Sequence, residues 1–128
     1  MAAPAATAQA QVLAWVNQAR QRTGLPPVES DDLLSTTAQA WSRYLAATGL
    51  LSHTGSDGSR VLDRYRAVGG TDARVGEILG AGRNLGEIER AWLGSDSHRQ
   101  LVLEPFWTNV GWGSSKTSSG EEVWVVVF

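Results

Sequence analysis

Val110–Phe128, with the sequence VGWGSSKTSSGEEVWVVVF, is the stretch that decides the fold. Its two ends, around Trp112 and over Val123–Phe128, are rich in the β-branched and aromatic residues that favour strands. Gly113–Gly120 between them is polar and holds the glycine and serine residues that are typical of turns. The pattern predicts a C-terminal β-hairpin, and with it a sheet in the second half of the chain.

Segments upstream of the hairpin show helical periodicity. Over Gln9–Thr23, apolar side chains recur at helical spacing, which predicts an amphipathic helix. A second helix is expected after a cap at Ser30, and it should end by Gly49 because glycine readily adopts the conformation that follows a helix. Two long helices therefore precede the short strands.

Shorter elements are predicted in the middle of the chain. A third helix would begin at a cap on Asp57 or Ser59 and end at Gly69–Gly70. Asn84 would open a fourth helix, and Ser97–Leu103 would form one more helical turn. The sequence has no internal repeat and no linker, so these elements are expected to build one α/β domain with one sheet.

Composition agrees with a single folded domain. The chain has 128 residues, is 42% hydrophobic and 19% charged, and contains six tryptophans, unlike a disordered chain. We expect a monomer in which residues 10–128 fold and residues 1–9 form a flexible N-terminal remnant. The small, uncharged residues of Ala2–Ala10 suit the stretch after a removed signal peptide, and equally an ordinary flexible terminus.

Charge and hydropathy argue against two classes of partner. The net charge is -2 and the eleven lysines and arginines are scattered, so no basic surface for a nucleic acid is predicted. No segment approaches the ~20 apolar residues of a membrane-spanning helix. Because the chain has no cysteine, only histidines and carboxylates are left to bind a metal or to transfer protons.

His53, Glu77 and His98 are the candidates for chemistry. The two histidines of the chain lie among small polar residues at expected element boundaries, and Glu77 lies in an expected strand over Val75–Leu79. Two imidazoles and one carboxylate are the ligand set of an open zinc site, and equally an acid/base set. Their spacing matches no short metal motif. Two solvated histidines and a charge on an edge strand therefore remain the alternative.

A serine nucleophile is a further alternative. Ser52 precedes His53 and Ser97 precedes His98. The chain has no GxSxG elbow, however, and neighbours in sequence do not face each other in a fixed geometry. Metal or acid/base chemistry is therefore the better interpretation of the histidines.

Five short segments carry a resemblance to a known family. In chain order they are Leu25-Pro26-Pro27, His53–Gly58, Gly76-Glu77, Trp92–Arg99 and Val110–Gly113. Together they resemble the CAP superfamily, the group of cysteine-rich secretory proteins, antigen 5 and pathogenesis-related proteins, in its compact bacterial form. The resemblance implies a three-layer α-β-α sandwich with a central, mainly antiparallel sheet. It also implies export to the extracellular space or the cell envelope.

The resemblance implies roles for the three candidates. His53 matches the first histidine of the family's surface cleft, Glu77 its glutamate and His98 its second histidine. In several relatives this cleft binds a divalent cation.

Two departures from the family pattern are visible. Ile78 stands where the family has an asparagine after the glutamate, so a polar neighbour is lost. The second acidic residue of the cleft is also missing from its usual place, and Asp57 or Asp96 is the candidate to replace it. For Asp57, a role as a helix cap is the better interpretation.

Three functions follow from these residues. The first is an exported module whose cleft binds a divalent cation, zinc above all, or a small ligand, with an affinity that falls below a pH of ~6.5 as imidazole is protonated. The second is a hydrolase in which His53, Glu77 and His98 activate a water against a peptide or cell-envelope substrate. The third is a structural or adhesive exported domain, in contact with cell-envelope components, in which the cleft residues form only a hydrogen-bond network. The binding module ranks first because no nucleophile is evident.

Overall fold

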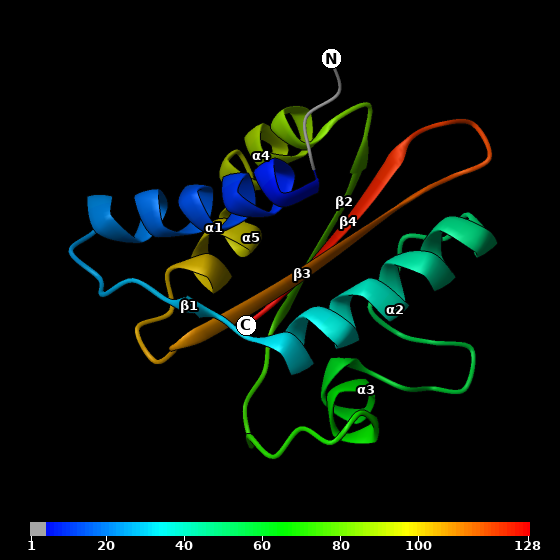
Figure 1. Cartoon of the computed structure of the whole chain (residues 1–128), viewed down its shortest axis with the longest axis horizontal. Coiled ribbons are helices and arrows are strands. Elements are labelled where there is room, and N and C mark those ends of the chain that lie inside the picture. The colour runs from blue at the N-terminus through cyan, green and yellow to red at the C-terminus, as the bar shows by residue number, and fades with distance from the viewer. Residues whose placement is uncertain (1–4) are drawn as a thin grey trace.

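A central sheet lies between two layers of helices in the computed structural model, which describes residues 5–128 (Figure 1). Helices α1, α4 and α5 cover one face of the sheet, and α2 and α3 cover the other. The elements are α1 (Ala5–Arg22), β1 (Glu29–Ser30), α2 (Asp32–Thr48), α3 (Val61–Ala67), β2 (Glu77–Gly82), α4 (Leu85–Leu93), α5 (Asp96–Val102), β3 (Asn109–Lys116) and β4 (Glu122–Val127). The expected α-β-α sandwich is confirmed.

The sheet has the strand order β1-β3-β4-β2. β4 pairs antiparallel with both β3 and β2, so that Val126 lies opposite Trp112 on one side and Ile78 on the other. The short β1 pairs parallel with β3. The sheet is therefore mainly antiparallel, and the predicted hairpin forms its centre.

The strand β4 is buried on both faces, which explains its uninterrupted apolar sequence. Trp124 and Val126 pack in the cluster formed with α1, α4 and α5. Val123, Val125 and Val127 pack in the cluster formed with α2 and α3. Successive side chains of a strand point to opposite faces, so one continuous valine-rich run serves two cores.

Two glycines of β3 let α2 approach the sheet closely. A Cβ atom at Gly111 would collide with the backbone of Leu34 and Ser35, and one at Gly113 would collide with the backbone of Gln39. The Gln39 amide uses this proximity, because it donates to the carbonyl of Ser114 at 2.9 Å and accepts from its N–H at 3.0 Å. The Val110–Gly113 segment is thus a docking surface for α2.

Polar side chains cap the starts of α4 and α2. Asn84 caps α4 as expected, with its side chain accepting from the N–H of Glu87. The expected cap of α2 at Ser30 is wrong, since Asp31 accepts from the N–H of Leu34 and Ser30 belongs to β1.

Neither Asp57 nor Ser59 caps α3, so this expectation is wrong. Arg60 is the residue before the helix, and its N–H donates to the Asp63 carboxylate at 2.9 Å. Asp57 instead accepts from the N–H of Ser59 within the preceding turn, at 2.9 Å. The side chain of Asp57 therefore closes a turn and does not begin the helix.

Other boundaries differ by a few residues. The strand expected over Val75–Leu79 is displaced, because β2 begins at Glu77 and continues to Gly82. β3 extends to Lys116, so the hairpin turn is shorter than the expected Gly113–Gly120. α5 ends at Val102, one residue before the expected end at Leu103.

The N-terminal helix begins earlier than the expected domain boundary. α1 starts at Ala5, so residues 5–9 of the expected N-terminal remnant are helical, and residues 1–4 lie outside the described residues. In the described part of the chain, no helix is both long and apolar enough to cross a membrane.

Arg20 ties α1 to the far side of its layer. The side chain is 0% exposed and its guanidinium donates to four backbone carbonyls, those of Pro26, Val102, Glu104 and Trp107. Two of these carbonyls, Val102 and Glu104, lie at and just beyond the end of α5. One buried arginine therefore fixes the loops at the N-terminal end of β1 and β3.

Candidate functional site

Glu77 occupies the first position of β2, where it pairs with Val127 of β4. Its side chain is only 2% exposed, a burial that an isolated carboxylate would not tolerate. Oε1 lies 2.9 Å from Nδ1 of His53, and Oε2 accepts from Arg64 at 2.9 Å. Both carboxylate oxygens are therefore engaged by side chains from other elements.

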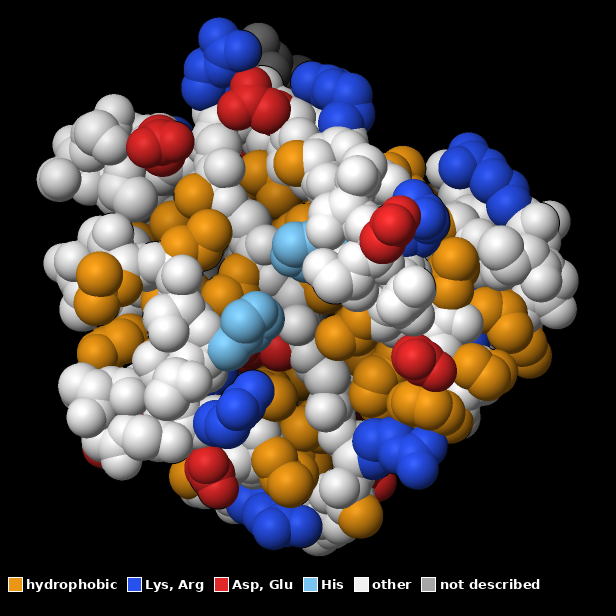
Figure 2. All heavy atoms as spheres, turned by 180° about the vertical axis from the view of Figure 1, so that it is seen from behind, with side chains coloured by type: hydrophobic (Ala, Val, Ile, Leu, Met, Phe, Trp, Pro, Cys, Tyr) orange, Lys and Arg blue, Asp and Glu red, His pale blue; other side chains and the backbone are white. Residues whose placement is uncertain are grey.

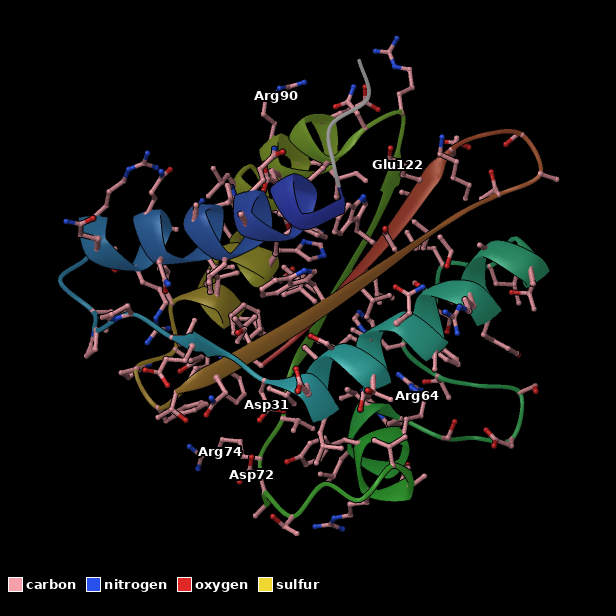
Figure 3. The ribbon with its side chains drawn as sticks, in the orientation of Figure 1. Asp31, Arg64, Asp72, Arg74, Arg90 and Glu122 are labelled. Atoms are coloured by element: carbon pink, nitrogen blue, oxygen red, sulfur yellow. The ribbon has the colours of Figure 1, made fainter. Side chains whose placement is uncertain are left out.

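Arg64 projects from α3 toward α2 (Figure 3). Besides Glu77, its guanidinium donates to the backbone carbonyls of Ser59 at 3.0 Å and of His53 at 3.2 Å. Its flat face lies 3.7 Å from the ring centroid of Trp41 on α2, a cation–π contact. Arg64 thus connects both helices of this layer to the start of β2 and to the loop of His53.

His53 lies on the loop between α2 and α3, as expected. The loop is held from two sides, by Arg64 at the carbonyl of His53 and by the Trp41 indole, which donates to the carbonyl of Ser52 at 3.0 Å. The side chain is 50% exposed. An ionised Glu77 can only accept, so Nδ1 of His53 donates and the Nε2 lone pair is directed away from the carboxylate.

His98 is the third residue of α5, which follows Ser95. Its Nδ1 lies 2.8 Å from the hydroxyl oxygen of Ser95. Burial and, to a smaller extent, the charge of His53 lower the pKa of His98 below its usual value. The two histidines are therefore close enough to interact electrostatically, and both lie on the same face of the molecule (Figure 2, pale blue).

A cleft of about 270 Å³ lies beside His53 and Glu77. Its other walls come from Arg60 and Val61 at the start of α3, from Val75 and Gly76 before β2, and from Leu101 of α5. Leu101 lies one turn beyond His98, so the helix that lines the cleft through Leu101 also carries that histidine. Gly76 permits the close packing there, since a Cβ atom would lie 2.8 Å from Trp107.

The structure brings two of the three predicted residues into contact and leaves the third apart from them. His53 and Glu77 are in direct contact, whereas the hydrogen bond of His98 goes to Ser95. Over the described residues, no three His, Asp or Glu side chains are arranged so that they could hold a metal ion together. Because both oxygens of Glu77 are engaged by side chains, this carboxylate positions the His53 ring.

Asp57 and Asp96, the candidates for a fourth position, are engaged elsewhere. Asp57 accepts from Ser59, and Asp96 forms an ion pair with Arg99 in the same helix. Ile78 is 1% exposed and packs in the core under α1 and α4, so the side chain at this position does not face the cleft.

Sequence reasoning missed the roles of Arg64 and Trp41. The periodicity of α2 predicts that Trp41 is buried in the core. It does not predict the contacts of the Trp41 indole with the carbonyl of Ser52 and with Arg64. The one signal for Arg64 is its spacing, since it lies three residues after Val61 and so on the inner face of a short helix. An arginine at such a position needs a buried acidic partner, and Glu77 is the strand carboxylate that needs a cation.

Comparison with known structures supports the fold. An outer surface protein of Borrelia burgdorferi superposes with a TM-score of 0.84 and 25% identity, covering 91% of this chain and 87% of that one. An extracellular protein of Bacillus anthracis that contains an SCP domain gives a TM-score of 0.79 at 22% identity, covering 93% of this chain and 39% of that one.

A curated sequence relative and a family model agree with this likeness. Protein YkwD of Bacillus subtilis is 28% identical over 119 residues, which span 92% of this chain and 45% of that protein. The chain therefore spans less than half of this longer relative. The model of the cysteine-rich secretory protein (CAP) family matches residues 13–128, nearly the whole chain. This chain is accordingly a member of the cysteine-rich secretory protein family.

Proposed function

We propose that this chain is an extracellular or cell-envelope binding domain whose cleft takes a divalent cation on the imidazoles of His53 and His98. The observation that supports the proposal best is the 2.9 Å contact between Nδ1 of His53 and the buried carboxylate of Glu77. A carboxylate behind a histidine fixes its tautomer and leaves Nε2 as the basic atom, as in many metal sites. The half-exposed ring presents that atom to solvent.

The donor set fits a borderline cation such as Zn²⁺, which imidazole nitrogen binds well. Glu77 is not a ligand in this proposal, because Arg64 and His53 occupy its oxygens. Two protein ligands leave further coordination positions to water or to a small molecule. A cation bound there would hold and polarise that molecule, and with only two protein ligands its affinity should be modest.

The proposed location outside the cell is inferred from similar proteins of known structure. One solved structure is named an outer surface protein and another is named an extracellular protein. A domain of the same family at the outside of the cell would meet free metal ions and envelope components. This part of the proposal is tested by fractionating the source cells and probing for the chain.

Hydrolysis is a less well supported alternative. The hydroxyl in contact with a histidine ring is that of Ser95, 2.8 Å from Nδ1 of His98, but Ser95 precedes α5 and His98 is three residues further on. This contact joins two side chains at the start of one helix, and the Ser95 side chain makes no capping hydrogen bond to the backbone there. In the described structure the hydrogen bonds of His98 include no carboxylate that would orient its ring as a general base.

Calorimetric titration with Zn²⁺ tests the proposal. The folded chain should release heat with a stoichiometry near one, and His53→Ala or His98→Ala should each abolish most of that heat. Glu121→Gln, an exposed carboxylate on the hairpin turn, is the control and should bind as the unmodified chain does. Absence of heat at neutral pH, or unchanged binding in both histidine variants, would overturn it.

A further inference from the structure

A second hollow of about 350 Å³ lies between α2, α3 and the loop before α3. It is separate from the cleft of His53, and Arg64 lies between the two, since its guanidinium contacts Glu77 and also lines this hollow. Trp41 and Tyr44 of α2 provide aromatic surface, Ala67 and Val68 at the end of α3 add apolar wall, and Asp57 lies on the loop.

The aromatic wall is a stacked pair. The rings of Trp41 and Tyr44 lie 4.7 Å apart at an interplanar angle of 14°, and Arg64 covers Trp41 at 3.7 Å. Tyr44 is only partly buried, so part of its surface remains open to a ligand. A hollow of this size with mostly apolar walls and a few polar groups is typical of small-molecule sites.

The charge of this hollow is set by two residues. Arg64 and Asp57 are the charged residues that line it. The positive charge of Arg64 is balanced by Glu77 at 2.9 Å. Asp57 accepts from the N–H of Ser59 through Oδ1 at 2.9 Å, and hydrogen bonds from Ser59 and, to a smaller extent, the charge of Arg64 lower its pKa. A negative charge held by Ser59 therefore lies at the exposed rim of an aromatic wall.

The loop is shaped to hold Asp57 there. At Gly55, a Cβ atom would lie 2.8 Å from Oδ1 of Asp57, 2.7 Å from Oγ of Ser59 and 3.5 Å from the Trp41 ring. The turn closes with hydrogen bonds from the N–H of Gly55 to Ser59 and from the N–H of Gly58 to Gly55. A larger residue at position 55 would push the carboxylate away from the aromatic pair.

We propose that this hollow binds a small organic cation, with an apolar or aromatic body against Tyr44 and Val68 and an ammonium group at Asp57. Aromatic faces attract cations, and the Asp57 carboxylate would add an ion pair at the same end. The carboxylate would repel an organic anion of the same shape. A neutral ligand of the same shape would gain only the apolar contact.

Three probes of matched shape test the assignment: 2-phenylethylamine, 2-phenylethanol and 3-phenylpropionate. Binding is followed by two-dimensional NMR, with the indole N–H of Trp41, which donates to Ser52, as the local reporter. The amine should shift this signal and bind about threefold more tightly than the alcohol at low salt, and the carboxylate should bind most weakly.

Two variants decide whether Asp57 gives the preference. Asp57→Asn keeps an oxygen for the N–H of Ser59 and removes the charge, so the amine should lose its advantage over the alcohol. Val68→Arg places a positive charge at the rim, and it should reverse the order of the amine and the carboxylate without disturbing the loop. Glu121→Gln, on the distant hairpin turn, should retain the original order.

Each result bears on the proposal directly. Equal binding of all three probes, or an amine preference that survives in Asp57→Asn, overturns it. Signal shifts that avoid Trp41 place the binding elsewhere and overturn it as well. Because His53 and His98 are unchanged in these variants, zinc binding measured in parallel reports separately on the cleft.

Discussion

Arg64 and Glu77 form a largely buried ion pair, with 2.9 Å between the guanidinium nitrogen and Oε2 and with side-chain exposures of 14% and 2%. The pair joins α3 to the first residue of β2. Since the second oxygen of Glu77 contacts His53, the ion pair fixes the orientation of the carboxylate that this histidine meets. Structure and site therefore depend on the same two residues.

Replacing Glu77 by glutamine should destabilise the fold strongly. Removing one partner of a buried ion pair leaves the other charge uncompensated, and we expect a loss of about 3 kcal/mol in the free energy of unfolding. Urea denaturation measures this loss in the free energy of unfolding. Glu87→Gln is the matched control, because its ion pair with Arg83 is exposed, and it should change stability little. Similar losses in the two variants would show that the Arg64–Glu77 pair contributes no more than a surface contact.

The second prediction concerns which ring nitrogen of His53 carries the proton. Glu77 accepts from Nδ1, so neutral His53 should carry its proton on Nδ1 and leave Nε2 unprotonated. Long-range proton–nitrogen NMR distinguishes the two tautomers. Arg64→Lys should shift the population toward the Nε2-protonated form, because lysine cannot hold the Glu77 carboxylate and the carbonyls of His53 and Ser59 with one planar group. A spectrum of the unmodified chain with Nε2 protonated would contradict the expectation.

Much of this architecture can be predicted because its signals are local. The strand residues around Trp112 and over Val123–Phe128, with the polar Gly113–Gly120 segment between them, predict a hairpin from strand propensity and turn chemistry alone. Asn84 predicts a helix start because its side chain can accept from a backbone N–H three residues on. Asp31 and Ser30 are adjacent and chemically similar as caps, so the sequence could not decide between them.

The site is harder to predict because its contacts join distant segments. His53 and Glu77 are candidates for their chemistry, and their 2.9 Å contact depends on how the loop after α2 meets β2. Arg64 is 13 residues from Glu77 in sequence, and the one local signal, its place on the inner face of a short helix, does not name its partner. β1 was missed because a two-residue strand after prolines has no periodicity to detect.

Arg20 should be among the residues most sensitive to substitution. Arg20→Met removes all the donors to the carbonyls of Pro26, Val102, Glu104 and Trp107, and buried carbonyls without partners are costly. We expect a loss of about 3 kcal/mol or more, measured by chemical denaturation. Arg22→Met, two residues later on the exposed side of the same helix, should be tolerated. If both variants were equally stable, the hydrogen bonds of Arg20 would contribute nothing measurable to the free energy of unfolding.

Glu89 should make stability depend on pH. The residue is 7% exposed, Gln11 donates to its Oε1 at 3.2 Å, and no hydrogen bond reaches Oε2 from the described residues. Burial raises the pKa of Glu89 above the usual 4.5, so the folded state holds this proton more tightly than the unfolded state. Stability contributed by the group is therefore present at low pH and lost as the pH rises from 4.5 through the raised pKa.

A comparison with Glu89→Gln isolates this effect. The stability of the unmodified chain relative to the variant should fall as the pH rises from about 4 toward neutrality. Glu87, on the same helix, should behave in the opposite way, because hydrogen bonds from Arg83 lower its pKa and its contribution is lost as the pH falls. Urea denaturation of the unmodified chain, Glu89→Gln and Glu87→Gln across this range gives the slopes. Parallel slopes for Glu89→Gln and the unmodified chain would refute the assignment.

Gly113 should not accept a methyl group. A Cβ atom there would collide with the backbone of Gln39, whose amide is bound to Ser114, so α2 would have to move off the sheet. We expect Gly113→Ala to cost about 3 kcal/mol, as overpacking of a rigid contact does. In Gly86→Ala the new Cβ atom would lie 3.5 Å from Asn84, an ordinary contact, and alanine in a helix gains up to about 1 kcal/mol. Thermal unfolding measures the stability change in both variants. A loss of stability in Gly113→Ala and a gain in Gly86→Ala would show that the contact between α2 and β3 requires glycine at position 113.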